Sequence, residues 1–83
     1  MDIAEIYARM TATLRDVLDN DDVVATPELT AKQVEGWDSL AHIRVVLSVE
    51  QAFGVRFSAA EVSKLNNVGD FARLIQSKLK PYP

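Results

Sequence analysis

The stretch GWDSL, residues 36–40, followed by an apolar run that ends at Phe53, decides the fold of this chain. Gly36 interrupts whatever precedes it. Asp38 can cap a helix, because its carboxylate accepts hydrogen bonds from amides that have no partner inside the helix. Ser39 then falls in the first helical turn, with its hydroxyl in solvent beside the positive end of the helix dipole, where a phosphate ester is tolerated. The Asp-Ser pair is either such a site or simply a helix cap.

The apolar residues of this run form two stripes at helical spacing. The stripe that we expect to face the core consists of Val45, Val49 and Phe53. The other stripe, with its polar neighbours, is a candidate docking surface for partner proteins. Its residues are Leu40, His42, Ile43, Arg44, Leu47 and Glu50. The alternative for each apolar residue is a place in the core.

The chain before this stretch predicts one helix and a long loop. Apolar residues at steps of three and four predict a helix over Ile3–Asp19. Residues 20–38 form a connection, because Pro27 is incompatible with a helix interior and Thr30 can cap only a single short turn. A loop of this length must be held by its own apolar residues. We expect these anchors to be Val23, Val24, Leu29 and Val34.

The chain after it predicts two more helices. Ser58 and Glu61 form a capping box that opens a short helix ending near Leu65. Asn67 caps a last helix over about Val68–Lys80. The expected fold is all-α, a small four-helix bundle with a short third helix and a long loop between the first two. One domain spans residues 1–83, ordered over about 3–80, with 81–83 as a tail.

Composition excludes several classes of function. The 83 residues carry a net charge of −3 and include no cysteine and one histidine, which excludes disulfides and makes a zinc site implausible. Residues 1–38 hold nine acidic and three basic side chains, a balance that disfavours nucleic acid as a partner. The sequence has no apolar stretch long enough to span a membrane and no signal-like start, so we expect a cytoplasmic monomer.

Catalysis is also disfavoured. Ser39 and His42 stand three residues apart and can be neighbours on a helix, as a nucleophile and its base would be. A hydrolytic site also needs an orienting carboxylate, an oxyanion hole and a pocket, and Leu40 stands where a nucleophile elbow has glycine. We therefore expect a protein that is not an enzyme.

The segment GWDSLAHIRVVLSVEQAFGVRF (36–57), together with NVGDF (67–71), resembles the phosphopantetheine attachment region of acyl carrier proteins. The resemblance extends from about Ile3 to Leu79. It implies that a phosphopantetheinyl transferase moves 4′-phosphopantetheine from coenzyme A onto Ser39, with Asp38 assisting the encounter. The arm ends in a thiol, which explains how a cysteine-free protein holds acyl groups. From bundle geometry, the residues expected to line a pocket for the acyl chain are Val45, Val49, Phe71 and Ile75.

The chain departs from the family in the charge of its second helix. Fatty-acid-synthesis carriers have a strongly acidic second helix, which basic enzyme surfaces read by charge complementarity. Here Ala41 and Arg44 occupy matching positions, leaving Asp38 and Glu50 as the acids of the region. This favours a specialised carrier for a fatty-acid, polyketide or other acyl pathway, served by an acyl-activating ligase or acyltransferase, a ketosynthase or similar enzymes. The alternatives are an aminoacyl or peptidyl carrier and an unmodified helical adaptor.

Overall fold

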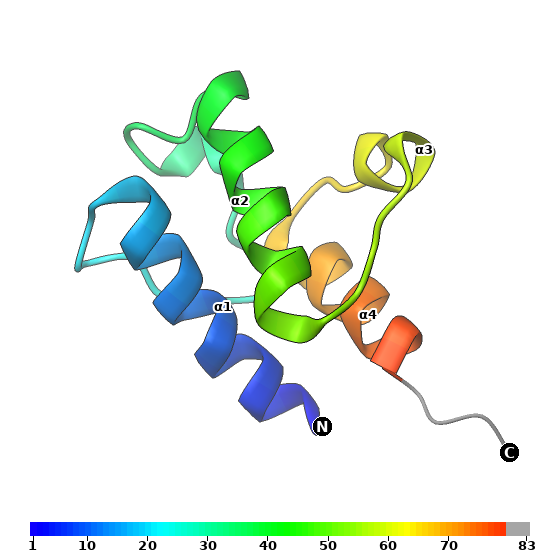
Figure 1. The fold of residues 1–83 in the computed structure, drawn as a ribbon. Helices are drawn as coiled ribbons and strands as arrows, with labels where there is room; N and C mark the ends of the chain where they lie inside the picture. The colour runs from blue at the N-terminus through cyan, green and yellow to red at the C-terminus, as the bar shows by residue number, and fades with distance from the viewer. Residues whose placement is uncertain (80–83) are drawn as a thin grey trace, which may run out of the picture.

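The computed structural model describes residues 1–79, and in that part of the chain the regular structure is entirely helical (Figure 1). The elements are α1 (Ile3–Leu18), the 3₁₀ turn η1 (Ala31–Gln33), α2 (Ser39–Phe53), α3 (Ala59–Ser63) and α4 (Val68–Leu79). The predicted all-α fold, the long first loop and the short third helix are confirmed. The predicted last helical residue, Lys80, and the tail 81–83 lie outside the described residues.

The helix ends follow from local hydrogen bonding. The Asp2 carboxylate accepts from the Glu5 amide at 2.9 Å and caps α1. Asp19 ends that helix in a left-handed conformation, with φ of 50°. Gly54 ends α2 in the same conformation, with φ of 68°, which glycine adopts without steric cost. The cap predicted for α4 is also present, because Asn67 Oδ1 accepts from the Asp70 amide at 2.8 Å.

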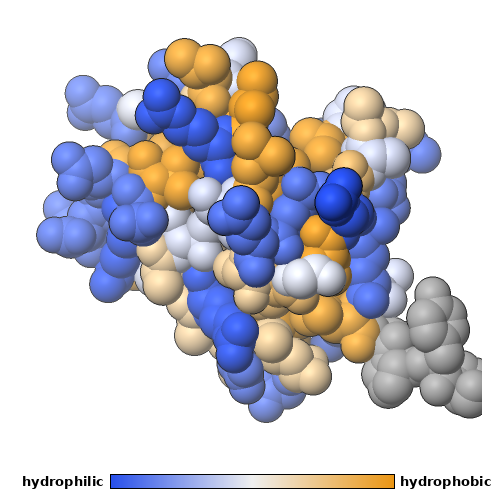
Figure 2. All heavy atoms as spheres, in the orientation of Figure 1, coloured by the Kyte–Doolittle hydropathy of each residue, from blue (hydrophilic) through white to orange (hydrophobic). Residues whose placement is uncertain are grey.

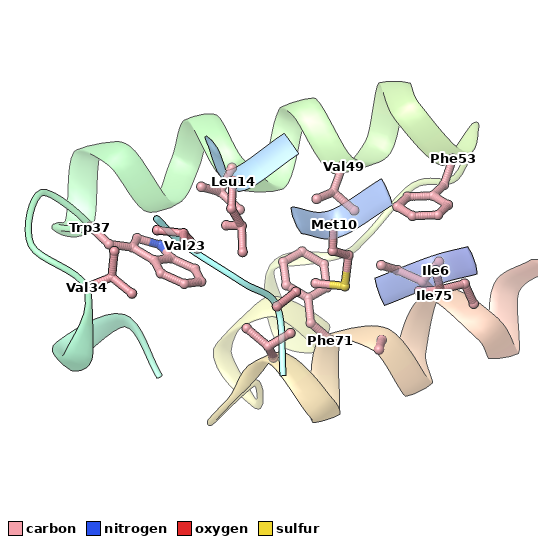
Figure 3. Packing of buried hydrophobic residues seen from close by; sticks show 14 residues of the cluster. Ile6, Met10, Leu14, Val23, Val34, Trp37, Val49, Phe53, Phe71 and Ile75 are labelled. Carbon is pink, nitrogen blue, oxygen red and sulfur yellow. The ribbon is translucent and has the colours of Figure 1, made fainter. Parts of the chain in front are cut away.

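The hydrophobic core lies where α1, α2 and α4 meet (Figure 3). Each helix contributes residues spaced three or four apart, so that one stripe of its surface is buried. These residues are Ile6, Met10 and Leu14 from α1, Val45, Val49 and Phe53 from α2, and Val68, Phe71, Ala72 and Ile75 from α4. The stripe expected to bring α2 to the core is therefore confirmed.

The first loop is anchored differently from our expectation. Val23 and Val34 are buried and Leu29 is half-buried, but Val24 is exposed and Ala25 is buried in its place. The reason is the pairing of this segment with α1. Arg15 Nε donates to the Val23 carbonyl oxygen at 2.8 Å, and the Ala25 amide donates to Thr11 Oγ1 at 2.9 Å. Between these two tethers the side chain of Val24 faces solvent.

The same loop supplies hydrogen-bond acceptors to the start of α4. The amide of Val68 donates to the Leu29 carbonyl oxygen at 2.8 Å, and the amide of Gly69 donates to that of Pro27 at 3.0 Å. Helix N-termini leave amides without intrahelical partners, and here loop carbonyls supply them. A Cβ on Gly69 would lie 2.8 Å from the Pro27 carbonyl oxygen, so this close approach requires glycine.

Helix α3 is held to α4 by one ion pair and by the packing of the residue that precedes it. Its Ser58–Glu61 capping box is present, but the helix ends at Ser63, earlier than expected, and none of its residues is buried. Glu61 pairs with Lys78 of α4 at 3.0 Å. Phe57, just before the helix, packs edge-on against Phe71, with ring centroids 5.4 Å apart. Figure 1 shows α3 standing apart from α1.

Candidate functional site

The site predicted from sequence lies at the start of α2, at the end of the molecule away from the N-terminus (Figure 1). Asp38 has an extended backbone and is the N-cap, as predicted. Its Oδ1 accepts from the Ala41 amide at 2.8 Å, and its carbonyl oxygen accepts from the His42 amide at 2.8 Å. These two bonds fix the first turn of the helix and with it the direction of Ser39.

Ser39 is the first residue of α2 and is exposed. Within residues 1–79 no hydrogen bond engages its hydroxyl, so the oxygen is open to an incoming group. The positive end of the α2 dipole lies beside it and favours an attached phosphate. An exposed hydroxyl at a rigid, positively polarised helix start fits a phosphodiester-linked arm. When bound, such an arm supplies the thiol that the chain itself lacks.

His42, also predicted for docking, is engaged by Trp37. It is half-buried, and its Nδ1 accepts a hydrogen bond from Trp37 Nε1 at 3.1 Å. Nδ1 is thus committed to the indole and is not available as a base for Ser39. His42, which was predicted for the docking surface, keeps part of its side chain at the surface, and its docking role stays a prediction. Burial lowers the pKa of His42 from its ordinary value, which keeps the imidazole neutral at pH 7.

Trp37 is the residue that sequence reasoning missed. Its side chain is buried and lies beside Val34 at one end of the core (Figure 3). The signal was available in the sequence, because an aromatic residue directly before a helix cap is well placed to anchor that cap. Gly36, with φ of 88°, makes the bend that turns the chain from Val34 into this position.

The apolar residues predicted for docking are exposed. Leu40 is 65% exposed, Ile43 57% and Leu47 54%, and Arg44 is exposed among them. Figure 2 shows hydrophobic side chains gathered on the surface over the upper turns of α2. Single exposed apolar residues are ordinary, but three on one helix face form a strip of the kind that partners cover.

Glu50, also predicted for docking, is engaged within the molecule. Its Oε2 accepts from the Phe57 amide at 2.8 Å and joins the end of α2 to the segment before α3. Asp38 is likewise occupied as a cap. The two acids of this region therefore serve the fold, and the outward charge of the α2 face comes from Arg44.

The four residues predicted to line an acyl pocket are all buried in the core. Behind the start of α2 lies a hollow of about 50 Å³. Its lining residues are Leu29, Ala31, Trp37, His42, Leu65, Asn66, Asn67, Val68 and Phe71. Phe71 is the one predicted pocket residue that this hollow shares. A volume of this size holds a few waters or a short chain of atoms.

Comparison with known proteins places this geometry in a family. A family model described as "Phosphopantetheine attachment site" matches residues 8–75. The acyl carrier protein of Thermotoga maritima is 31% identical over 90% of this chain and 93% of its own length. That of Helicobacter pylori is 30% identical over 86% and 91%. The solution structure of holo acyl carrier protein from Geobacter metallireducens superposes with a TM-score of 0.84 and 38% identity, over 89% of this chain and 85% of that one.

The fold and the site define a small helical carrier domain, and the chain belongs to the acyl carrier protein family, whose cofactor is covalently attached 4′-phosphopantetheine. Members of this family are non-catalytic carriers that interact with the enzymes of a pathway. No helix within residues 1–79 has both the length and the apolar character needed to cross a membrane.

Proposed function

We propose that Ser39 carries 4′-phosphopantetheine and that the chain presents acyl thioesters to partner enzymes. The observation that carries this proposal is the free, exposed hydroxyl of Ser39 at the capped start of α2, inside the segment matched by the attachment-site family. The absence of cysteine agrees with it, because the thiol must then arrive on the arm.

Loading requires a transferase, because within residues 1–79 no side chain is hydrogen-bonded to the Ser39 hydroxyl as a base. In the proposed step the Ser39 oxygen forms a new bond to the phosphorus next to the pantetheine of coenzyme A. The bond from that phosphorus to the nucleotide portion breaks, and the hydroxyl proton passes to a base of the transferase. The contribution of this chain is positional: Asp38 fixes the turn, and the helix dipole favours the phosphate that stays on Ser39.

The partners are a phosphopantetheinyl transferase and the acyl-loading and acyl-using enzymes of one pathway, which a monomeric carrier visits in turn. We assign their docking to the exposed strip Leu40, Ile43 and Leu47, with Arg44 within it. A partner suited to this strip has an apolar patch with an acidic group opposite Arg44. It differs from the basic surfaces that read an acidic helix. This supports a specialised acyl pathway rather than generic fatty-acid synthesis.

The exposed strip also favours a second candidate function. An adaptor that binds a partner through Leu40, Ile43 and Leu47 needs no modification at Ser39. The two functions differ in one observable, the covalent state of the serine.

The test is intact-mass measurement after incubation with coenzyme A, Mg²⁺ and a broad-specificity phosphopantetheinyl transferase. We expect the wild type to gain one phosphopantetheine. Ser39→Ala removes the proposed acceptor and should gain none, and Ser63→Ala, which removes another exposed serine, should gain one like the wild type. An unmodified wild type with a native circular dichroism spectrum would reject the carrier function and leave the adaptor.

A further inference from the structure

Trp37 connects the first turn of α2, which carries Asp38 and Ser39 and is called the attachment turn below, to the core. It stands immediately before Asp38, the cap of α2, and only 8% of its surface is exposed. Its amide donates to the Val34 carbonyl oxygen at 3.2 Å, and its indole lies beside Val34 in Figure 3. A displacement of Trp37 must therefore displace the backbone of Asp38 and Ser39.

The indole of Trp37 depends on His42. A buried indole N–H requires an acceptor, and His42 Nδ1 supplies it at 3.1 Å, with the ring centroids 6.0 Å apart. Trp37 precedes the cap and His42 lies one turn beyond it. This one hydrogen bond therefore spans the turn that carries Ser39.

Only an unprotonated Nδ1 accepts such a bond, so the imidazole is neutral with its proton on Nε2. Burial lowers the pKa of His42 below about 6.5, and the nearby positive end of the α2 dipole also disfavours a cation. Protonation places an N–H opposite the indole N–H, and two donors cannot form the bond.

The charged groups around His42 do not counteract the lowering of its pKa. On α2, the Asp38 carboxylate accepts from Ala41 and that of Glu50 accepts from Phe57. His42 faces two hollows, one towards the first loop and α4 and one towards α3. Among the described residues that line them with His42, only Glu50 is titratable. No carboxylate among these residues is placed to hold the imidazolium.

We propose that His42 is a positioning residue for Ser39: its Nδ1 holds the Trp37 indole and so fixes the turn that carries Asp38 and Ser39. Protonation of His42 opens this connection, and the attachment turn then loosens in mildly acidic solution. The role in loading rests on the proposed function, whereas the structural coupling does not.

The test uses NMR hydrogen exchange of the whole chain between pH 5 and 8, corrected for intrinsic exchange rates. Two protons report the coupling: the Trp37 indole N–H and the Ala41 amide, which is bonded to the Asp38 cap. His42→Leu removes the acceptor and keeps an apolar side chain. His42→Asn keeps an acceptor near the Nδ1 position and does not titrate.

We expect both protons to exchange about threefold to tenfold faster in His42→Leu than in the wild type at pH 7.5, the effect of losing one ordinary hydrogen bond. His42→Asn should restore protection. In the wild type, protection should fall with a midpoint below pH 6.5, and in His42→Asn it should show no such step. Equal exchange of the Ala41 amide in all three proteins, or the same pH step in His42→Asn, overturns the coupling.

Transferase kinetics test the role in loading. His42→Leu should raise KM for the carrier about threefold to tenfold, the range that corresponds to one lost hydrogen bond, with kcat within about twofold, and His42→Asn should return KM to the wild-type value. An unchanged KM in His42→Leu overturns that role. A wild type that is never loaded instead rejects the proposed function, and the exchange measurements still decide whether His42 fixes the turn.

Discussion

The two faces of α2 carry similar residues in opposite environments. Val45 and Val49 are fully buried in the core to which α1, α2 and α4 contribute, whereas Ile43 and Leu47 are more than half exposed. A globular protein gains stability from the first arrangement and gains little from the second. The difference indicates that the buried face maintains the fold, while the exposed face is available to partners.

The largest expected difference between substitutions on the two faces of α2 is in the free energy of unfolding. Val49→Ala removes two methyl groups from a fully buried site and should lower the free energy of unfolding by about 2 kcal/mol, through lost burial and an unfilled cavity. Leu47→Ala on the exposed face should change it by less than about 0.5 kcal/mol. Urea unfolding followed by circular dichroism measures both. Equal losses in the two variants would show that the strip is part of the core.

A smaller effect concerns recognition by charge. Ala41→Asp combined with Arg44→Glu gives the start of α2 the acidic character that basic enzyme surfaces read. Loading of the double variant by a generic fatty-acid-synthesis enzyme should be faster than that of the wild type by about fivefold to tenfold at low salt, with the gain reduced as salt is added. Initial rates at two ionic strengths measure it. An unchanged rate would show that the charge at the start of α2 does not decide which enzymes recognise the chain.

The smallest effect lies in α3, which has no buried face to compare with that of α2. Hydrogen bonding from the Ser58 amide and the neighbouring Lys78 lower the pKa of Glu61 below its ordinary value. Stability from the ionised carboxylate is therefore present above about pH 4.5 and is lost as pH falls through the lowered value.

Glu61→Gln should accordingly lower Tm at pH 7 by less than Val49→Ala does, because glutamine retains the acceptor for Ser58 and loses only the charge. The difference from the wild type should shrink as the pH falls through the lowered pKa of Glu61 and the carboxylate becomes protonated. Differential scanning calorimetry at pH 7 and pH 3 makes the comparison. A difference that persists at pH 3 would assign the effect to geometry rather than charge.

Sequence reasoning predicted the parts of this molecule that depend on local signals. Hydrophobic spacing and helix caps located the four helices and the buried and exposed stripes of α2. Asp38 and Ser39 were placed correctly at the start of that helix, because capping is decided by residues within one turn.

The remaining features depend on contacts that no local pattern contains. Val24 and Ala25 are both apolar, and only the tethers to α1 decide which of them is buried. The Trp37–His42 hydrogen bond and the Glu50–Phe57 hydrogen bond depend on side-chain direction in the folded state. For this reason sequence reasoning did not foresee these internal hydrogen bonds of His42 and Glu50, and the docking role of both residues stays a prediction.

The backbone hydrogen bonds from Val68 and Gly69 to the first loop also bear on the order of events during synthesis. They join segments roughly forty residues apart, so the loop that leads to Ser39 gains these bonds only after the start of α4 has left the ribosome. A nascent chain that already displays Ser39 still lacks them. The loop that leads to Ser39 therefore reaches its final hydrogen bonding only when α4 is in place, so the last helix helps to hold the segment before the first turn of α2.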